Sequence, residues 1–315
     1  MKLRSLLLIA LVAVVFCGCH SYQPTSITVA SYNLRNANGS DSAKGNGWGQ
    51  RYPVIAKMVQ YHDFDIFGTQ ECFIHQLKDM KEALPGYDYI GVGRDDGKEK
   101  GEHSAIFYRT DKFDVIEKGD FWLSETPDVP SKGWDAVLPR ICSWGHFKCK
   151  DTGFEFLFFN LHMDHIGKKA RVESAFLVQD KMKELGKGKE LPAILTGDFN
   201  VDQTHQSYDA FVSKGVLCDS YEKADFRYAI NGTFNDFDPN SFTESRIDHI
   251  FVSPSFQVKR YGVLTDTYRS IVGKGEKKQA NDCPEEIDIK TYQARTPSDH
   301  FPVKVELEFD QRQQK

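Results

Sequence analysis

The stretch of residues 154–162 restricts the fold of this 315-residue chain more than any other segment. Residues 154–161 read FEFLFFNL and are apolar at both odd and even positions. Because successive side chains of a β-strand point to opposite faces, a strand with this sequence has to be covered on both sides. The segment Asp151-Thr152-Gly153, directly before it, is typical of a hairpin turn. The pattern therefore indicates a sandwich or another layered arrangement of sheets.

Further apolar stretches along the chain predict an α/β (α+β) fold. The other expected strands are residues 27–34, 64–69, 104–108, 141–149, 192–198, 247–252 and 302–309. Helical spacing of apolar residues predicts helices over residues 51–62, 74–84 and 168–185. We expect residues 268–296 to form a long charged surface loop. No Pro/Ser-rich linker divides residues 25–310, so we expect one domain over residues 26–315.

The charge of the chain argues against tight, nonspecific binding to long nucleic acid. The chain has 40 basic and 45 acidic residues, which gives a formal net charge of −5. Residues 1–19 contain two basic residues and no acid, so the remainder carries −5 − 2 = −7. Nonspecific nucleic-acid binding depends on phosphate neutralisation by Lys and Arg, which an acidic protein disfavours. With 40% hydrophobic residues, the chain can still bury a sizeable core.

Residues 1–19 have the layout of a bacterial export signal. A basic start, with Lys2 and Arg4, precedes the apolar residues 6–16, which are too few to cross a bilayer comfortably. The pair Gly18-Cys19 resembles a lipobox, in which the cysteine is lipidated and becomes the first mature residue. Ordinary signal cleavage and an uncleaved anchor remain alternatives. We expect an exported protein of the cell envelope or periplasm, attached to the membrane only through a lipid on Cys19 and a polar tether over residues 20–25.

Polar residues that bind metals or transfer protons stand at the ends of the expected strands. They occur in SYNLR at residues 31–35, TQE at 69–71, NLHMDH at 160–165, GDFN at 197–200, RIDHIF at 246–251 and SDHFP at 298–302. Asp248 lies inside an otherwise apolar strand, where an ionised carboxylate costs several kcal/mol unless it has a partner. The sequence therefore predicts a partner for Asp248.

This ordered set of motifs resembles the endonuclease/exonuclease/phosphatase family of Mg²⁺-dependent phosphoesterases, which includes DNase I-like nucleases, inositol phosphatases and sphingomyelinases. The resemblance covers nearly all of residues 26–310. Residues 121–127, FWLSETP, followed by Pro139-Arg140, are similar to a subgroup of bacterial exported members. The resemblance implies a four-layer α/β/β/α sandwich of two packed mixed sheets, with the active site at one edge of the sheets.

The resemblance and the ligand chemistry together predict a Mg²⁺ site, with Mn²⁺ as the alternative ion. Mg²⁺ prefers hard oxygen ligands and keeps several waters, so one or two carboxylates and an amide suffice. Glu71 is the first candidate ligand. Asn33 and Asp299 are expected to complete or orient the ligand shell.

Catalytic roles follow from the same comparison. His300 is expected against the scissile phosphate, with Asp248 accepting its other N–H. Asp198 would position or deprotonate the attacking water, and Asn200 would hold the phosphate or that water. Both Asp198 and His300 suit the role of base. The expected electrophilic pair, which stabilises charge on the phosphoryl oxygens, is His162 and Arg140.

Substrate choice is open at the level of sequence. A phosphodiester or phosphomonoester substrate is expected, whether a small phosphodiester, a nucleic acid or a lipid headgroup. The alternatives are a sphingomyelinase- or inositol-phosphatase-like headgroup hydrolase, or a noncatalytic module that binds a phosphate ligand. Four loop aromatics could stack on a substrate or anchor their loops, namely Trp122, Trp134, Phe234 and Phe237. The clearest basic cluster is Lys168, Lys169 and Arg171. We expect a monomer.

Overall fold

Two β-sheets lie face to face in the computed structural model, which describes residues 24–310 except residues 189–190, 275–283, 285 and 288. The first sheet has the order β10 (Phe226–Tyr228), β12 (Gln257–Val263), β15 (Val303–Phe309), β1 (Thr25–Asn33), β2 (Ile66–Gln70), β4 (Ile106–Arg109) and β3 (Tyr87–Ile90). The second has the order β5 (Phe113–Trp122), β6 (Ile141–Cys149), β7 (Glu155–His162), β8 (Ala193–Asp198), β11 (Asp248–Val252) and β9 (Cys218–Asp219). Both are mixed, because β1 and β2 run parallel, as do β7 and β8.

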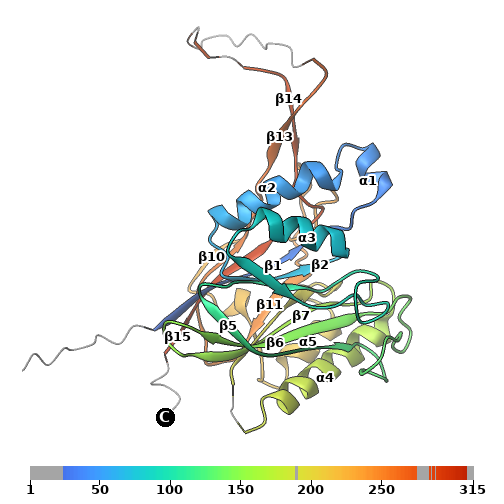
Figure 1. The fold of residues 1–315 in the computed structure, drawn as a ribbon, viewed down its shortest axis with the longest axis vertical. Helices are drawn as coiled ribbons and strands as arrows, with labels where there is room; N and C mark the ends of the chain where they lie inside the picture. The colour runs from blue at the N-terminus through green and yellow to red at the C-terminus, as the bar shows by residue number, and fades with distance from the viewer. Residues whose placement is uncertain (1–23, 189–190, 275–283, 285, 288, 311–315) are drawn as a thin grey trace, which may run out of the picture.

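Helices cover the outer faces of the two sheets (Figure 1). Helices α2 (Trp48–Tyr61) and α3 (Ile74–Ala83) lie on the first sheet, and α4 (Lys168–Leu185) and α5 (Gln206–Val212) lie on the second. The short helices are α1 (Gly39–Ala43) and α6 (Ser220–Lys223). The four-layer α/β/β/α sandwich is thereby confirmed.

Strand β7 contributes to two separate cores, as its two apolar faces predict. Phe156 and Phe158 belong to the cluster between the sheets, together with Val303 and Val305 of β15. Phe159, on the other face, belongs to the cluster beneath α4 and α5. A third cluster lies between the first sheet and helices α2 and α3. Burial of both faces of the central strand thus fixes the layer order.

A buried polar network joins the two sheets beneath one edge of the sandwich. The side-chain amide of Asn160 donates hydrogen bonds to the backbone oxygens of Thr69 and Ala105 across the interface, both at 2.9 Å. Its oxygen accepts from Gln70 Nε2 at 2.7 Å and from Thr196 Oγ1 at 3.0 Å. Because both donor and both acceptor positions of the Asn160 amide are filled, this side chain joins the two sheets without a large desolvation penalty; Gln70 Oε1 has no partner among the described residues.

The expectation of one long loop over residues 268–296 is wrong at both ends of that segment. Strands β13 (Tyr268–Ile271) and β14 (Tyr292–Arg295) pair antiparallel and form an arm that projects from the sandwich, at the top of Figure 1. Backbone pairing satisfies the N–H and C=O groups that the two strands turn toward each other, in a segment whose polar composition resembles that of a loop.

The expected export signal and most of the expected tether, residues 1–23, lie outside the described residues. In the part of the chain that the structure describes, no helix is long and apolar enough to cross a membrane.

Candidate active site

The polar strand ends meet at one edge of the sandwich, as the motifs predict. In the second sheet, Asp198 at the end of β8 stands directly beside His162 on β7 and Asp248 on β11. In the first sheet, Asn33 ends β1 beside Gln70, the last residue of β2. The two packed sheets thus present their functional residues from neighbouring ends.

Three residues of this edge have left-handed backbone conformations. They are Arg35, with φ 56°, Glu71, with φ 67°, and Asn200, with φ 50°. Each lies one or two residues beyond a strand, where the chain turns sharply. Non-glycine residues adopt such angles at a cost of about 1–3 kcal/mol, and this strain is frequent at functional sites. The turns direct the side chains of Glu71 and Asn200 into the site.

His300 is held by the partner that the buried Asp248 requires. Nδ1 of His300 donates a hydrogen bond to Asp248 Oδ2 at 2.8 Å, and both side chains are buried. Burial opposes a charge on the imidazole, but the Asp248 and Asp198 carboxylates outweigh it and hold the pKa of His300 well above its usual value. His300 is therefore an imidazolium whose Nε2 faces Asp198, with Asp198 Oδ2 at 3.8 Å.

Asp198 lies at the centre of the cluster. Its Oδ2 accepts from Asn33 Nδ2 at 2.9 Å, and its Oδ1 accepts from the backbone N–H of Asn200 at 2.9 Å. Burial, with a further contribution from the Asp248 charge, raises the pKa of Asp198 to about 7, although the His300 cation opposes the shift. A carboxylate that takes up a proton near neutral pH is suited to general-base chemistry.

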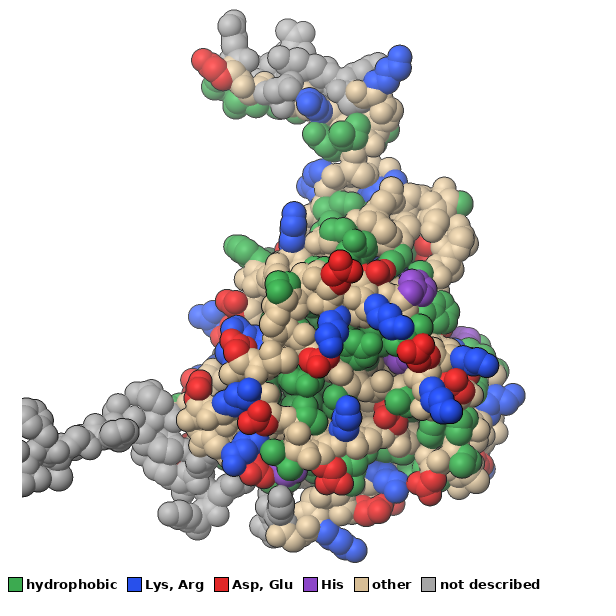
Figure 2. Space-filling model, viewed as in Figure 1, with side chains coloured by type: hydrophobic (Ala, Val, Ile, Leu, Met, Phe, Trp, Pro, Cys, Tyr) green, Lys and Arg blue, Asp and Glu red, His purple; other side chains and the backbone are tan. Residues whose placement is uncertain are grey.

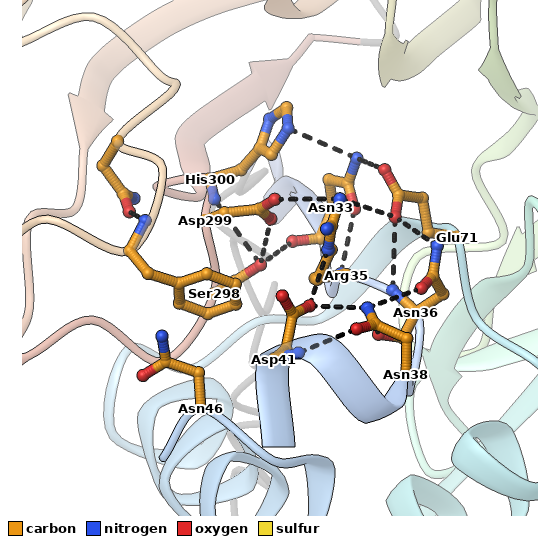
Figure 3. A network of polar contacts seen from close by, with 12 residues as sticks. Asn33, Arg35, Asn36, Asn38, Asp41, Asn46, Glu71, Ser298, Asp299 and His300 are labelled. Carbon is orange, nitrogen blue, oxygen red and sulfur yellow. Dashed lines mark hydrogen bonds and ion pairs between the residues drawn. The ribbon is translucent and has the colours of Figure 1, made fainter. Parts of the chain in front are cut away.

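Glu71, Asn33 and Asp299 come together around the guanidinium of Arg35 (Figure 3). Arg35 Nη1 lies 3.3 Å from Asp299 Oδ2 and 3.9 Å from Glu71 Oε2. Asn33 Nδ2 donates to Glu71 Oε1 at 3.0 Å, so Asn33 orients this carboxylate. Burial and the nearby Glu71 charge raise the pKa of Asp299 to about 6.

This group has the chemistry of a divalent-cation site. Two carboxylates share one positive guanidinium group, which shows that a cation is favoured between them. Ligand atoms of Glu71, His162 and Asp198 also lie within 4.8 Å of one another. The carboxylate oxygens of Glu71, Asp198 and Asp299 suit Mg²⁺ or Mn²⁺. Glu71 belongs both to the group around Arg35 and to the group with His162, and is therefore the first candidate ligand. Asp198 also belongs to a further group with Asp248 and His300.

Arg140 lines the cleft and has one unpartnered donor. Its Nε donates to Asp164 Oδ2 at 3.3 Å and its Nη2 donates to His165 Nδ1 at 2.9 Å, whereas Nη1 has no hydrogen-bond partner among the described residues. Asp164 and His165, whose part in the site was open at the level of sequence, thus fix Arg140. A buried, unpartnered guanidinium N–H is costly and is available for an anionic oxygen of a ligand.

His162 and Asn200 form a second hydrogen-bonded pair beside Asp198. Asn200 Nδ2 donates to Nε2 of His162 at 3.1 Å and to the backbone oxygen of Met163 at 3.0 Å. Burial, and next the positive charge of Arg140, hold the pKa of His162 well below its usual value. The imidazole of His162 is therefore neutral.

Sequence reasoning missed Glu102, Arg94 and the role of Asn36. Glu102 lines the cleft and pairs with Arg94 Nη1 at 2.6 Å, while Asn36 Nδ2 donates to Glu71 Oε2 at 3.0 Å. Burial raises the pKa of Glu102 despite Arg94. Glu102 follows an irregular loop and does not end a strand, so no strand-end pattern points to it. Asn36 lies three residues beyond Asn33, and the turn of the chain after β1 brings its side chain back to Glu71.

Several other polar residues lie away from the site. His249 is buried on the other face of β11, where its Nε2 lies 3.0 Å from the backbone oxygen of Val201, as strand parity predicts. None of Lys168, Lys169 and Arg171 lines the cleft, and Arg171 instead donates to the backbone oxygen of Asp164. This basic cluster is therefore no substrate track.

The four loop aromatics differ in their positions. Phe234 lines the cleft and makes an edge contact with the ring of His300, at 5.1 Å between centroids. Trp122 is buried and donates to the backbone oxygen of Arg94, and Phe237 packs under the guanidinium of Arg51. Trp122, Trp134 and Phe237 do not line the cleft, so Phe234 is the member of this set placed to contact a substrate.

The cleft above these residues has a volume of about 430 Å³ and is open to solvent. The two sheets pack face to face and carry carboxylates, amides and imidazoles at one edge of the sandwich. This arrangement defines a phosphoesterase of the DNase I-like fold. The chain belongs to the endonuclease/exonuclease/phosphatase family, whose model matches residues 30–300.

Similar proteins extend along nearly the whole chain. A crystal structure of an endonuclease/exonuclease/phosphatase family protein from Bacteroides thetaiotaomicron is 87% identical, with a TM-score of 0.85, and covers 92% of this chain and 100% of that chain. A mannosyl-6-phosphatase from Bacteroides thetaiotaomicron VPI-5482 is 86% identical, with a TM-score of 0.84, and covers 90% of this chain and 100% of that chain. An uncharacterized protein of Acanthamoeba polyphaga mimivirus is 30% identical over 276 residues, or 83% of this chain and 92% of the relative.

Proposed function

We propose that the protein is a Mg²⁺-dependent phosphomonoesterase that releases phosphate from a sugar 6-phosphate, with mannose 6-phosphate as the first candidate substrate. The observation that carries this proposal is the 86% identity to the mannosyl-6-phosphatase, over the whole length of that chain. The site supports it, because the cleft is small and open, and Phe234 offers an apolar ring beside His300. Sugar rings place their C–H faces against such aromatic surfaces.

In this proposal Asp198 is the base and His300 is a fixed positive charge. The raised pKa of His300 leaves it protonated, so it cannot accept a proton from water near neutral pH. Asp198, with a pKa of about 7, can do so. The water oxygen bonds to phosphorus as its proton passes to Asp198, the bond from phosphorus to the sugar oxygen breaks, and the leaving oxygen takes a proton from solvent.

The remaining polar groups bind the phosphate. Arg140 and His300 both line the cleft and would supply positive N–H donors to the phosphoryl oxygens, which carry the charge of the transition state. Glu71, with Asn33 and Asp299 beside it, is suited to hold a Mg²⁺ ion. When bound, such an ion supplies further positive charge to the phosphoryl oxygens.

The surface charge favours a small substrate over a polynucleotide. Acidic and basic side chains are intermixed on the face shown in Figure 2, which has no continuous basic track. The three-residue basic cluster that a nuclease could use lies off the cleft. The acidic net charge of −5 also disfavours binding of a polynucleotide.

We further propose that this is a monomeric, exported bacterial member of the family, held at the cell envelope by a lipid on Cys19. The support for export and lipidation is the order of Lys2, Arg4, the apolar residues 6–16 and the pair Gly18-Cys19. In fractionated cells, we expect the full-length protein in the membrane fraction and a Cys19→Ala variant to lose the lipid by mass spectrometry. An unmodified Cys19 in the mature protein would contradict lipidation.

A substrate panel tests the proposed function. Purified protein with Mg²⁺ is assayed for phosphate release from mannose 6-phosphate and for hydrolysis of bis(p-nitrophenyl) phosphate. We expect kcat/KM for the monoester to exceed that for the diester by at least about 100-fold, since the proposed substrate carries a terminal phosphate. A diester preference would identify the protein as a phosphodiesterase instead.

A further inference from the structure

The catalytic cleft continues into two further hollows along one side of the site. A hollow of about 310 Å³ shares Phe234, Asp236 and Ile247 with the cleft. A second hollow, of about 420 Å³, shares Phe242 and Thr243 with the first. The shared residues place the three spaces next to one another, and we call the outer two hollows the side groove.

Two exposed phenylalanine rings line the side groove. Phe234 is 40% exposed and Phe242 is 71% exposed, and Phe242 stands on the wall common to the two outer hollows. These phenylalanine rings leave apolar surface exposed to water. A ligand that covers this surface would gain about 25 cal/mol of binding free energy per Å² of apolar area buried. Such ring positions suit a ligand with flat apolar faces.

The groove is a fixed structure and is held on the catalytic residues. Thr233 and Asn235, at its inner end, make backbone bonds to Phe301 and Asp299 on either side of His300. Farther out, Asn231 donates to the backbone oxygen of Ser241 at 2.8 Å and accepts from the backbone N–H of Thr243 at 3.0 Å. Phe242 lies between these two anchored residues. Its ring is therefore presented by a backbone that is already ordered.

The charge of the groove excludes a polyanion. Among the described residues that line the two outer hollows, Arg246 is the one basic side chain, and it is bound to Asp219 Oδ2 at 3.0 Å. Asp236, Glu222 and Glu244 line the same hollows and carry negative charge. Their carboxylates would repel the phosphates of an oligonucleotide but can accept hydrogen bonds from hydroxyl groups.

We propose that the substrate is the phosphorylated end of a neutral oligosaccharide, whose following sugar units lie in the side groove across Phe234 and Phe242. This inference rests on the proposed function, because the phosphorylated sugar occupies the catalytic cleft. It extends that function from a free sugar phosphate to a phosphorylated glycan chain.

The test compares three substrates by phosphate release. They are mannose 6-phosphate, a mannotriose with the phosphate on O6 of its terminal mannose, and a 5′-phosphorylated trinucleotide. We expect kcat/KM for the phosphorylated mannotriose to be at least tenfold above that for mannose 6-phosphate, with the trinucleotide lowest. Equal values for the two sugars, or a preference for the trinucleotide, would overturn the proposal.

A matched pair of variants locates the effect. Phe242→Ala should reduce the ratio of the two sugar kcat/KM values to near one, whereas Tyr61→Ala, which removes an 82% exposed ring on α2, should leave the ratio and both rates unchanged. A ratio that survives Phe242→Ala would show that the groove does not bind the chain.

A further measurement separates this proposal from the proposed function. If neither sugar phosphate is hydrolysed, the proposed function fails, and binding of unphosphorylated mannotriose is measured by calorimetry. Binding that is weakened at least tenfold by Phe242→Ala still supports a glycan groove, whereas absence of binding to the wild-type protein rejects it.

Discussion

At the residue scale, the protonated state of His300 depends on two carboxylates from the second sheet. Asp248 holds Nδ1, and Asp198 lies near Nε2. From the sequence alone, either Asp198 or His300 could be the general base. The structure makes His300 a cation and gives Asp198 a pKa of about 7, which favours Asp198 as the base.

The first prediction concerns this pair. His300→Ala should lower kcat for mannose 6-phosphate by about 10²–10⁴-fold, through loss of a positioned charge. Asp248→Asn should lower it by about 10–100-fold, since the imidazole stays but its orientation and charge are no longer fixed. Steady-state kinetics measures both, with exposed His75→Ala as the control. Full activity in His300→Ala would exclude the proposed role.

The second prediction concerns stability and pH. In the unfolded chain Asp198 titrates near 3.8, and in the fold near 7, so between these values the folded state binds more protons. Stability therefore falls as pH rises through this interval. In EDTA, Asp198→Asn should therefore gain stability relative to the wild-type protein as the pH rises from 4.5 to 8, because the variant has no buried carboxyl group to ionise.

Urea unfolding at the two pH values measures this difference, and Asp180→Asn on the exposed face of α4 is the control. A variant that loses stability relative to the wild-type protein over this rise in pH would show that Asp198 is stabilised as a carboxylate.

At the scale of elements, the close approach of β2 to β7 and β8 sets the distance between the sheets. A Cβ at Gly68 of β2 would overlap the side chains of Asn160 and Thr196. The network that joins the sheets therefore requires glycine at this position.

The third prediction follows from this contact. Gly68→Ala should destabilise the protein by about 1–3 kcal/mol, because either the sheets separate or the Asn160 network breaks. Gly49→Ala, in helix α2 with open space around its Cα, should leave stability unchanged or raise it by up to about 1 kcal/mol. Chemical unfolding measures the free energy of unfolding of both variants. Equal stability of the two variants would contradict the proposed contact.

Much of the element order could be predicted from sequence, for physical reasons. Strands β7, β8 and β11 are buried on both faces and read as apolar runs. Strand β5 was missed because it is an edge strand, and its residues 117–120 read EKGD. Edge strands tolerate such polar sequences, which lack the periodicity of a buried strand.

The sequence predicts those residues of the candidate site that stand at the ends of strands. Asn33, Asp198 and Asp248 each stand at such an end, and register then brings them together. Glu102 and Arg94 reach the cleft from an irregular loop, whose path depends on tertiary contacts such as the bridge of His103 to Cys72. Such contacts leave no periodic signal in the sequence.

At the scale of the whole molecule, the charge and the cleft together favour small, uncharged leaving groups. The fourth prediction is that duplex DNA does not inhibit hydrolysis of mannose 6-phosphate at low salt. The acidic net charge of −5 and the acidic residues that line the side groove repel a polyanion. Rates measured with and without excess DNA test this expectation. Inhibition that disappears with added salt would indicate a nucleic-acid surface.

The central claim is that Glu71 and its neighbours form a metal site that serves phosphate release. The most direct test is the initial rate of phosphate release from mannose 6-phosphate as a function of Mg²⁺ concentration, for the wild-type protein and for Glu71→Gln. We predict no activity in EDTA, saturation with Mg²⁺ in the wild type, and kcat/KM at least about 100-fold lower in Glu71→Gln. An undiminished rate in EDTA, or full activity of Glu71→Gln at low Mg²⁺, would contradict the account.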